Sequence, residues 1–317
     1  MEIGYALSSE EHSPVHLVRY AQRAEEVGFD FALISDHYHP WVDRQGHSPF
    51  VWCTIGGIAQ STSRLRLGTG VTCPLLRIHP AIIAQAAATA AAMMPGRFFL
   101  GVGTGENLNE HVLGDKWPPA EVRLEMLDEA IDVIRLLWQG GEQSYRGAHY
   151  EIEEARLYTL PEELPPIYVA ADGEQSAEIA ARAGDGLIGV SPEAELIDQF
   201  TVAGGKRKPR YGQLTVCYAG GEAEARRIAH TWWPNAGLKG NLAWEVKKPS
   251  LFEHACAPLR EEDIADSIIC GPDAKRHRAA IKKFIDSGYD HVYIHQVGPD
   301  QEGFFRFYQE EIIPAFR

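Results

Sequence analysis

The chain has 317 residues, of which 45% are hydrophobic and 23% are charged, and its formal net charge is −14 at pH 7. These values are typical of a globular enzyme. The negative charge argues against a nucleic-acid partner, whose phosphate backbone would repel such a surface, although a local positive patch can still bind a small anion. The length suggests about two domains, but α/β barrels often exceed about 250 residues as one domain.

Apolar runs typical of strands alternate with helical patterns along almost the whole chain. The expected strands are residues 3–7, 31–35, 65–71, 98–102, 167–171, 186–190, 214–218 and 292–295. The expected helices are residues 14–27, 51–60, 80–94, 120–139, 175–183, 222–231, 273–287 and 304–316. This alternation predicts an α/β fold, specifically a (β/α)8 TIM barrel, rather than a shorter doubly wound sheet.

Two segments interrupt the alternation. Residues 144–159 alternate like a hairpin, with Arg146-Gly147 at the turn. Residues 232–265 are rich in Trp, Pro, Gly and Lys and show no clear period, which favours an irregular insertion near the barrel mouth. The sequence contains no internal repeat or linker, so we expect residues 1–317 to form one domain.

The five cysteines include no CxxC pair, and their odd number favours a reduced, cytoplasmic protein over a disulfide scaffold. We expect no signal peptide, because Met1–Gly4 lead directly into a strand. The longest apolar stretch, residues 81–94, is too short to cross a bilayer, so we expect no membrane partner.

The second strand ends in the most distinctive chemistry of the chain, Ser35-Asp36-His37-Tyr38-His39-Pro40-Trp41. Ionisable groups at the carboxyl end of a barrel strand are typical of a catalytic site. Asp36 and His37 are candidates for acid–base chemistry or cofactor contact. Two alternatives stay open: a metal-dependent hydrolase built on Asp36, His37 and His39, with His47 as a further donor, and a purely structural histidine pair.

Other strands end in similar patterns. Ser8-Ser9-Glu10-Glu11-His12 follows the first strand and is also typical of a helix N-cap. Glycines 68, 70, 101, 103 and 105 would let a flat ligand lie against bare backbone; a glycine-rich turn is the alternative. Neither glycine stretch completes GxGxxG after a first strand, which argues against a Rossmann NAD site. Ala170-Ala171-Asp172-Gly173 precedes a helix and suggests a phosphate cradle, although the carboxylate would repel a phosphate.

Four stretches, taken together, resemble the luciferase-like TIM-barrel flavoenzymes: residues 35–41, residues 46–50, the run from Arg97 to Glu110, and Arg182-Ala183-Gly184-Asp185-Gly186. The resemblance covers nearly the whole chain in order. It points to the deazaflavin-dependent branch related to F420-dependent glucose-6-phosphate dehydrogenase. It implies an eight-stranded barrel, coenzyme F420, a homodimer, and hydride transfer between the deazaflavin and an alcohol, a carbonyl or an activated alkene.

The resemblance also implies residue roles. His37 would take the proton of the substrate hydroxyl, Glu106 would protonate the reduced cofactor, and Trp41 would wall the pocket and stabilise developing charge. Glu10 would lie near the substrate. The implied cofactor contacts are Asp36, Gly70, Val71, Cys73, Asn109, Ala170, Ala171 and Asp172, with a bulge and a cis peptide bond at Gly70-Val71 behind the reacting ring. No metal is expected.

The chain departs from the sugar-phosphate enzymes where three basic residues hold their substrate's phosphate. These positions align with Glu193, Ala243 and Asp266, and carboxylates there would repel a phosphate. We therefore expect a substrate other than glucose 6-phosphate, although Lys239, Lys247 and Lys248 are possible replacements. An FMN-dependent monooxygenase on the same barrel is the main alternative function, because both flat rings use the same strand ends. A flavin-binding protein without turnover is another.

Overall fold

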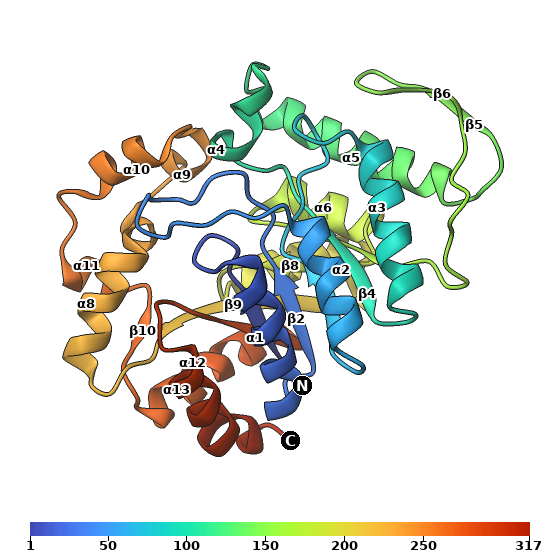
Figure 1. Ribbon diagram of the computed structural model, residues 1–317. Coiled ribbons are helices and arrows are strands. Elements are labelled where there is room, and N and C mark those ends of the chain that lie inside the picture. Colours follow the sequence, from blue (N-terminus) through green and yellow to red (C-terminus); the bar gives the residue numbers. More distant parts are fainter.

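The computed structural model describes residues 1–317 and has a closed barrel of eight parallel strands at its centre. Around the barrel the strands follow the order β11-β1-β2-β3-β4-β7-β8-β9, and a pairing of β9 with β11 closes the circle. Their bounds are β1 (Glu2–Leu7), β2 (Phe31–Ile34), β3 (Arg66–Thr69), β4 (Phe98–Val102), β7 (Ile167–Ala170), β8 (Gly186–Gly189), β9 (Arg210–Cys217) and β11 (His291–Gln296). Helices surround them (Figure 1), so the predicted (β/α)8 fold is confirmed.

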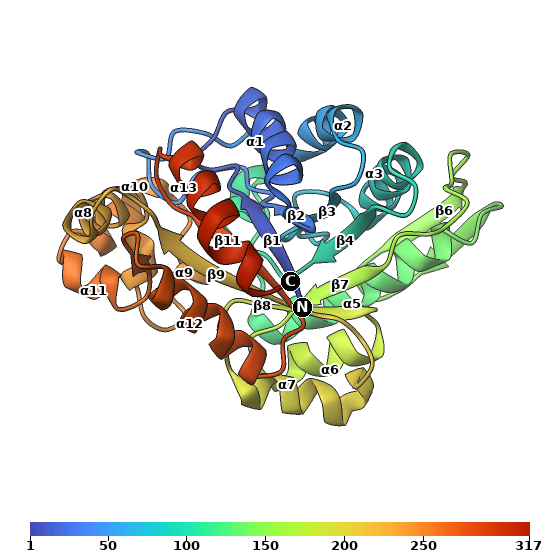
Figure 2. The ribbon, with the colours of Figure 1, turned by 90° about the horizontal axis from the view of Figure 1, so that it is seen from below.

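The helices that cover the barrel are α1 (Pro14–Val27), α2 (Val51–Ser61), α3 (Pro80–Met93), α5 (Ala120–Leu137), α6 (Glu174–Arg182), α7 (Ala194–Phe200), α8 (Glu222–Trp232), α12 (Ala274–Asp286) and α13 (Gln301–Phe307). The two chain termini lie close together at the end of the barrel that faces the viewer in Figure 2. Ser13 caps α1 by accepting a hydrogen bond from the His16 N–H at 3.4 Å. The stretch Ser8–His12 therefore precedes the helix and does not cap it.

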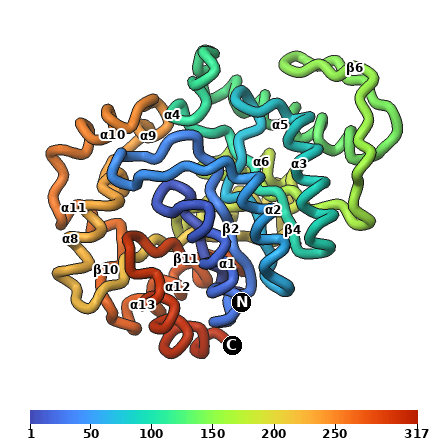
Figure 3. The backbone as a smooth tube through the Cα atoms, viewed as in Figure 1, coloured from blue at the N-terminus to red at the C-terminus, as the bar shows by residue number.

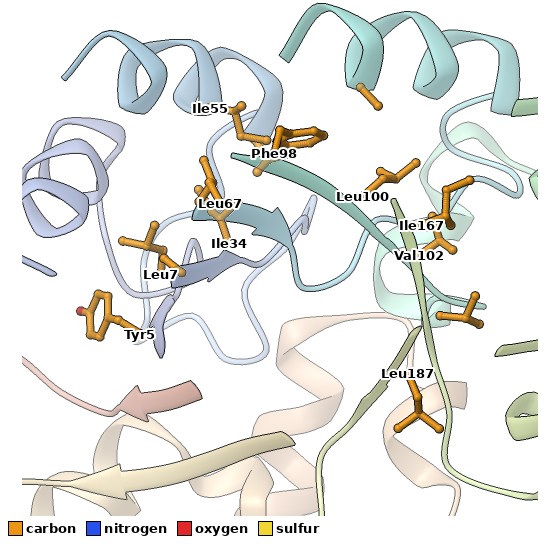
Figure 4. Close-up of a cluster of buried hydrophobic side chains, with 14 of the residues drawn as sticks. Tyr5, Leu7, Ile34, Ile55, Leu67, Phe98, Leu100, Val102, Ile167 and Leu187 are labelled. Carbon is orange, nitrogen blue, oxygen red and sulfur yellow. The ribbon is translucent and has the colours of Figure 1, made fainter. Parts of the chain in front are cut away.

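Two apolar layers stabilise the barrel. In the outer layer, strand side chains such as Leu67 and Phe98 pack under the helices, and Figure 4 shows Ile55 of α2 beside them. Inside the barrel, aromatic rings near the amino ends of the strands form a separate cluster, in which Tyr168 stacks on Tyr211 with ring centroids 4.9 Å apart. These rings fill the amino end of the barrel, so space for a ligand is left at the carboxyl end.

The structure corrects the prediction for residues 232–265. This segment contains a short turn of 3-10 helix (Pro234–Gly237) and the helices α9 (Leu242–Glu245), α10 (Pro249–Cys256) and α11 (Glu261–Ala265). Helices of four to eight residues are too short to show a helical period in the sequence. The segment packs on the loop after β2, where Val42, Leu108 and Phe252 form a buried cluster.

Other elements differ in smaller ways. Residues 144–159 include the antiparallel pair β5 (Gln143–Arg146) and β6 (Glu151–Ala155), which reaches away from the barrel in Figure 1. Helix α7 was not expected, and neither were the short helix α4 (Asn107–Glu110) and the two-residue strand β10 (Ile269–Cys270). The last helix begins at Gln301 and gives way to π and 3-10 turns after Phe307. No helix is both long enough and apolar enough to span a membrane.

His277 on α12 gives the fold a pH-dependent stability. The imidazole is fully buried, with Nδ1 2.9 Å from the Tyr308 hydroxyl and Nε2 2.9 Å from the Gly271 carbonyl, and burial lowers its pKa from 6.5 to about 4. As the pH falls, the unfolded chain therefore binds a proton at His277 at a higher pH than the folded chain does. We expect this residue to remove about 3 kcal/mol of unfolding free energy as the pH falls from about 6.5 to about 4.

Urea unfolding at several pH values measures this loss. His277→Phe should flatten the dependence between pH 6.5 and pH 4, while His254→Ala, an exposed histidine on α10, should leave it as in the wild type. An unchanged slope in His277→Phe would contradict the assignment.

Candidate active site

A cavity of about 340 Å³ lies at the carboxyl end of the barrel. Its lining includes all twelve residues that the sequence analysis selected: Glu10, Asp36, His37, Trp41, Gly70, Val71, Cys73, Glu106, Asn109, Ala170, Ala171 and Asp172. They come from the ends of five neighbouring strands, because parallel strands all present their carboxyl ends on one side. The structure thus places these residues together, while their individual roles stay predictions.

A buried carboxylate and an imidazole face each other across the ends of β1 and β2. Glu10 Oε1 lies 3.2 Å from His37 Nε2, and Glu10 Oε2 accepts hydrogen bonds from the hydroxyls of Ser8 and Ser35 at 3.0 and 2.7 Å. Burial alone would raise the pKa of Glu10, but His37 and the Ser35 hydroxyl outweigh it, so the pKa lies below its ordinary value. The Glu10 carboxylate is therefore ready to stabilise a protonated His37.

The other ring nitrogen of His37 fixes where the protons lie. Nδ1 is 3.2 Å from the carbonyl oxygen of His39, which can only accept, so Nδ1 carries a hydrogen. Nε2 then faces the Glu10 carboxylate with either a lone pair or a second hydrogen. With a lone pair at Nε2, the imidazole is placed to accept a proton from a neighbouring hydroxyl, as a general base does.

Trp41 forms a wall beside this pair. Its ring centroid lies 5.1 Å from that of His37, and its other side packs edge-to-face on Phe252 of α10 at 5.2 Å. The loop that carries Trp41 passes beside α4, α9 and α10 over the barrel mouth, as the tube in Figure 3 shows. The insertion therefore helps to hold one side of the cavity, and it also contributes Trp233, Ala243 and Trp244 to the lining.

Asp36 has fixed partners below the cavity. One carboxylate oxygen accepts from the Thr72 hydroxyl at 2.8 Å, and the other pairs with the Arg77 guanidinium at 2.9 Å. The same guanidinium lies 3.4 Å from Glu110, and all three side chains are at most 6% exposed. Arg77 thus neutralises two buried carboxylates and anchors the start of the loop that carries His37.

Asn109 links the ends of β2 and β4. Its Oδ1 accepts from the backbone N–H groups of Tyr38 and His39 at 2.9 and 3.2 Å, and its Nδ2 donates to Glu106 Oε2 at 3.2 Å. Glu106 lines the cavity, and its second carboxylate oxygen has no hydrogen-bond partner in the protein. Asn109 therefore orients Glu106 and leaves one oxygen available for proton transfer.

Bare backbone forms the opposite wall. A Cβ on Gly103 would lie 2.8 Å from Val71 Cγ2, and Gly105 adopts a positive φ of 71° with Cys73 Sγ 2.6 Å from its missing Cβ. The Gly70–Val71 peptide bond is cis, as the resemblance implied. Gly68 and Gly101 do not line the cavity; they make room for the Phe99 ring and the Thr69 carbonyl, which corrects their expected role.

Cys73 closes this wall with a neutral thiol. Burial and the nearby Glu110 raise the pKa of the thiol well above its usual range. Cys73 is therefore a soft apolar contact and is poorly suited to act as a nucleophile.

The Ala170–Asp172 loop lies in front of α6. Ser176 Oγ accepts from the backbone N–H groups of Asp172 and Gly173 at 3.1 and 3.2 Å, and the Asp172 side chain is exposed. The Ser176 hydroxyl also lies 3.3 Å from Asp172 Oδ1, and Asp172 lines the cavity together with the small residues Ala170 and Ala171.

A metal centre finds no support in the geometry. No group of three or more His, Cys, Asp or Glu side chains is placed to hold a metal ion. His39 Nδ1 instead lies 2.9 Å from the Leu108 carbonyl, and Asp36 pairs with Arg77.

A family model described as luciferase-like monooxygenase matches residues 1–291. The chain belongs to this luciferase-like family. It is 36% identical to an F420-dependent glucose-6-phosphate dehydrogenase of Microbacterium testaceum, over 100% of this chain and 98% of the relative. It is 37% identical to an F420-dependent hydroxymycolic acid dehydrogenase of Mycobacterium tuberculosis, over 99% of this chain and 88% of the relative.

A solved structure of an F420-dependent secondary alcohol dehydrogenase with an F420-acetone adduct has the same luciferase-like architecture. It superposes with a TM-score of 0.93 at 29% identity, covering 100% of this chain and 99% of that one. These three proteins are named for different substrates, so the resemblance to this branch is confirmed while the substrate of this luciferase-like chain stays open.

Sequence reasoning missed several residues of this luciferase-like site. Arg77 lies in an otherwise apolar loop, and its partners Asp36 and Glu110 are 41 and 33 residues away in the chain. Trp233 and Trp244 belong to the segment without a period. Glu11 and His295, by contrast, fit the strand-end pattern, because Glu11 lies in the stretch after β1 and His295 lies near the end of β11, but neither of them received a role from the sequence.

Proposed function

We propose that this chain is an F420-dependent oxidoreductase that exchanges a hydride between the deazaflavin and an uncharged alcohol, carbonyl or activated alkene. The observation that carries the proposal is the Glu10–His37 pair, which lies in the same cavity as the bare-backbone wall of Gly70, Gly103 and Gly105. Its relatives named as F420-dependent dehydrogenases support the choice of cofactor.

The cavity fits a flat ring with an extended tail. The three glycines line the cavity with backbone alone, and a Cβ at any of them would collide with a neighbouring side chain, so this wall stays close-packed and flat. The Ala170–Asp172 loop extends it toward the start of α6. Asp36, Val71, Cys73 and Asn109 would complete the contacts with the cofactor. When bound, F420 supplies a carbon atom that accepts or donates a hydride, which is chemistry that no side chain can perform.

The protein supplies the proton chemistry around that step. A substrate hydroxyl beside His37 Nε2 gives its proton to the imidazole, and Glu10 stabilises the imidazolium that forms. Trp41 excludes water from one side of the pair and presents its ring to the reacting carbon. Glu106 holds a proton at the oxygen that Asn109 leaves free.

The charges that line the cavity disfavour a phosphorylated substrate. No lysine or arginine lines it, whereas five acidic residues do: Glu10, Asp36, Glu106, Glu110 and Asp172. Arg77 neutralises Asp36 and Glu110 from outside the lining, and the other three form no ion pair with a lysine or arginine. Of the positions aligned with the phosphate-binding cations, only Ala243 lines the cavity, while Glu193 and Asp266 do not. Lys239, Lys247 and Lys248 are exposed and lie outside the lining, so they do not replace those cations.

Titration of the purified protein with F420 and, separately, with FMN tests the cofactor. We expect F420 to bind tightly, which a change in its fluorescence reports, and FMN to bind weakly. Tight binding of FMN alone would instead support a monooxygenase that receives reduced flavin from a partner reductase, and oxygen consumption would then be the assay.

Glucose 6-phosphate provides a test of the substrate class. We expect no saturable reduction of F420 with this sugar phosphate, and measurable reduction with at least one uncharged secondary alcohol, because a phosphate would meet acidic residues and no lysine or arginine in the lining. Turnover of glucose 6-phosphate with a micromolar KM would refute this part of the proposal.

Three further features belong to the proposal. Residues 1–317 act as one domain, since the insertion contributes part of the cavity lining. The enzyme is a homodimer, supported by exposed apolar side chains on α1 and α3, the helices that pack on either side of α2, namely Val15, Ile82 and Met93, and at Phe50 before α2. It works in the cytoplasm, supported by five unpaired cysteines. Light scattering coupled to size exclusion measures the oligomeric state.

A further inference from the structure

A second carboxylate–imidazole pair lies beside the first. His295 comes near the end of β11 and lines the same cavity, although only 3% of the residue is exposed. Its Nε2 is 3.1 Å from Glu11 Oε2, and Glu11 Oε1 accepts the backbone N–H of Gly298 at 2.9 Å. Because Glu10 and Glu11 are consecutive and β1 pairs with both β2 and β11, their carboxylates hold one histidine on each side of β1.

The contacts of His295 fix the orientation of its ring. A carboxylate only accepts hydrogen bonds, so Nε2 carries the hydrogen that it gives to Glu11. The Trp233 ring packs edge-on against the imidazole, with centroids 4.4 Å apart and planes at 72°. The imidazole is therefore held by a fully buried carboxylate on one edge and by an indole on its face.

The remaining ring nitrogen has no partner in the protein. His295 Nδ1 is buried and makes no hydrogen bond, and the residue lines the same cavity as Glu10 and His37. Buried polar atoms without a partner are rare, and a donor without a partner is rarer than an acceptor. The unpaired nitrogen therefore carries a free lone pair, on a residue that lines the cavity.

We propose that His295 Nδ1 binds the substrate by accepting a hydrogen bond from a second hydroxyl group, separate from the carbinol that reacts at His37. The substrate is then an uncharged diol or polyol. Glu11 is a positioning residue that acts through His295. The inference rests on the proposed function, and it agrees with a lining that contains five carboxylates and no cation.

Steady-state kinetics of the F420-loaded enzyme with paired alcohols tests the inference. Each pair has one carbon skeleton, with and without a second hydroxyl, such as cyclohexanol with 1,2-cyclohexanediol and 2-butanol with 2,3-butanediol. For the wild type we expect kcat/KM to favour the diol by about 10-fold to 100-fold, the scale of one hydrogen bond to a buried group. No preference in any pair would overturn the inference.

Variants separate binding from structure. His295→Phe should raise KM for the diol and so abolish the preference between the two members of each pair, whereas His295→Asn, which keeps an acceptor near Nδ1, should restore part of it. An equal loss for both members of each pair would show that His295 supports the fold or the chemistry, and would overturn the assigned role.

Nitrogen NMR of histidine-labelled protein gives a readout that needs neither cofactor nor turnover. The His295 signals, identified by their absence in His295→Phe, should show an unprotonated Nδ1 that shifts on addition of the diol and not of the mono-alcohol. A protonated Nδ1, or no response to the diol, would refute the inference even if F420 binds. Failure of F420 to bind, with the NMR response intact, would refute the proposed function alone.

Discussion

His37→Ala lowers kcat by about 10²-fold to 10⁴-fold, the usual cost of removing a general base, while F420 still binds. The imidazole is the group that can take the substrate proton, because its Nε2 faces the cavity beside Glu10 and its Nδ1 is committed to the His39 carbonyl. Alanine removes both nitrogens without touching the glycine wall that would hold the cofactor. Single-turnover reduction of F420, followed by absorbance, measures the chemical step directly.

Glu106→Gln tests the other end of the same proton chemistry. We expect a loss of kcat of the same size, because glutamine keeps the hydrogen-bonding shape of the side chain and loses the exchangeable carboxyl proton. The glutamine amide can turn either its oxygen or its NH2 group toward Asn109 Nδ2, and only the oxygen accepts that hydrogen bond. F420 affinity must therefore be measured alongside the rate.

Two surface variants serve as controls for these measurements. His254→Ala and Glu121→Gln change exposed residues of α10 and α5 that lie outside the cavity, so both should keep wild-type rates. If His37→Ala and Glu106→Gln also kept wild-type rates, the assigned roles would be wrong, whichever cofactor binds.

Arg77→Met lowers the free energy of unfolding by about 3–5 kcal/mol, the typical cost of breaking a buried ion pair. The side chain is 6% exposed and neutralises Asp36 and Glu110, which are 1% and 0% exposed. Methionine fills a similar volume but leaves two uncompensated carboxylates in the interior. Urea unfolding at pH 7 measures the difference from the wild type.

The pH dependence of the unfolding free energy of Arg77→Met shows whether unpaired carboxylates cause the loss of stability. Without Arg77, burial raises the folded-state pKa of both carboxyls above their unfolded values, so the folded chain binds protons more readily. The deficit in stability should therefore shrink at pH 5 and grow at pH 8. Arg182→Met, which removes a mostly exposed partner of Asp128, should change little at either pH. A deficit independent of pH would point to lost packing instead.

The sequence predicted the barrel and the reaction site for the same reason. Short apolar strands that end in polar or glycine-rich stretches mark the carboxyl edge of a parallel sheet, and that edge brought twelve residues from separate strands into one cavity. Helical patterns of apolar residues also located most helices, such as α1, although its cap is Ser13 and not the Ser8–His12 stretch.

Long-range partners could not be predicted in this way. Nothing local to Arg77 shows that it meets Glu110, and nothing local to Phe252 shows that it packs on Trp41. The prediction for the alternating glycines was wrong for another reason. Their spacing shows only where side chains are absent, and the fold alone determines that Gly103 lines the cavity while Gly68 makes room for the Phe99 ring.

The origin of the two halves of the cavity has a consequence for the evolution and redesign of this enzyme. The glycine wall comes from β3 and β4, whereas Trp233, Ala243 and Trp244 come from one continuous segment that enters and leaves the barrel at α8 and β10. We expect that exchanging residues 233–265 as a cassette changes which molecules are accepted, because the exchange replaces these three lining residues and also Phe252, which packs on Trp41. Recombination at these two junctions gives a compact route from one substrate range to another.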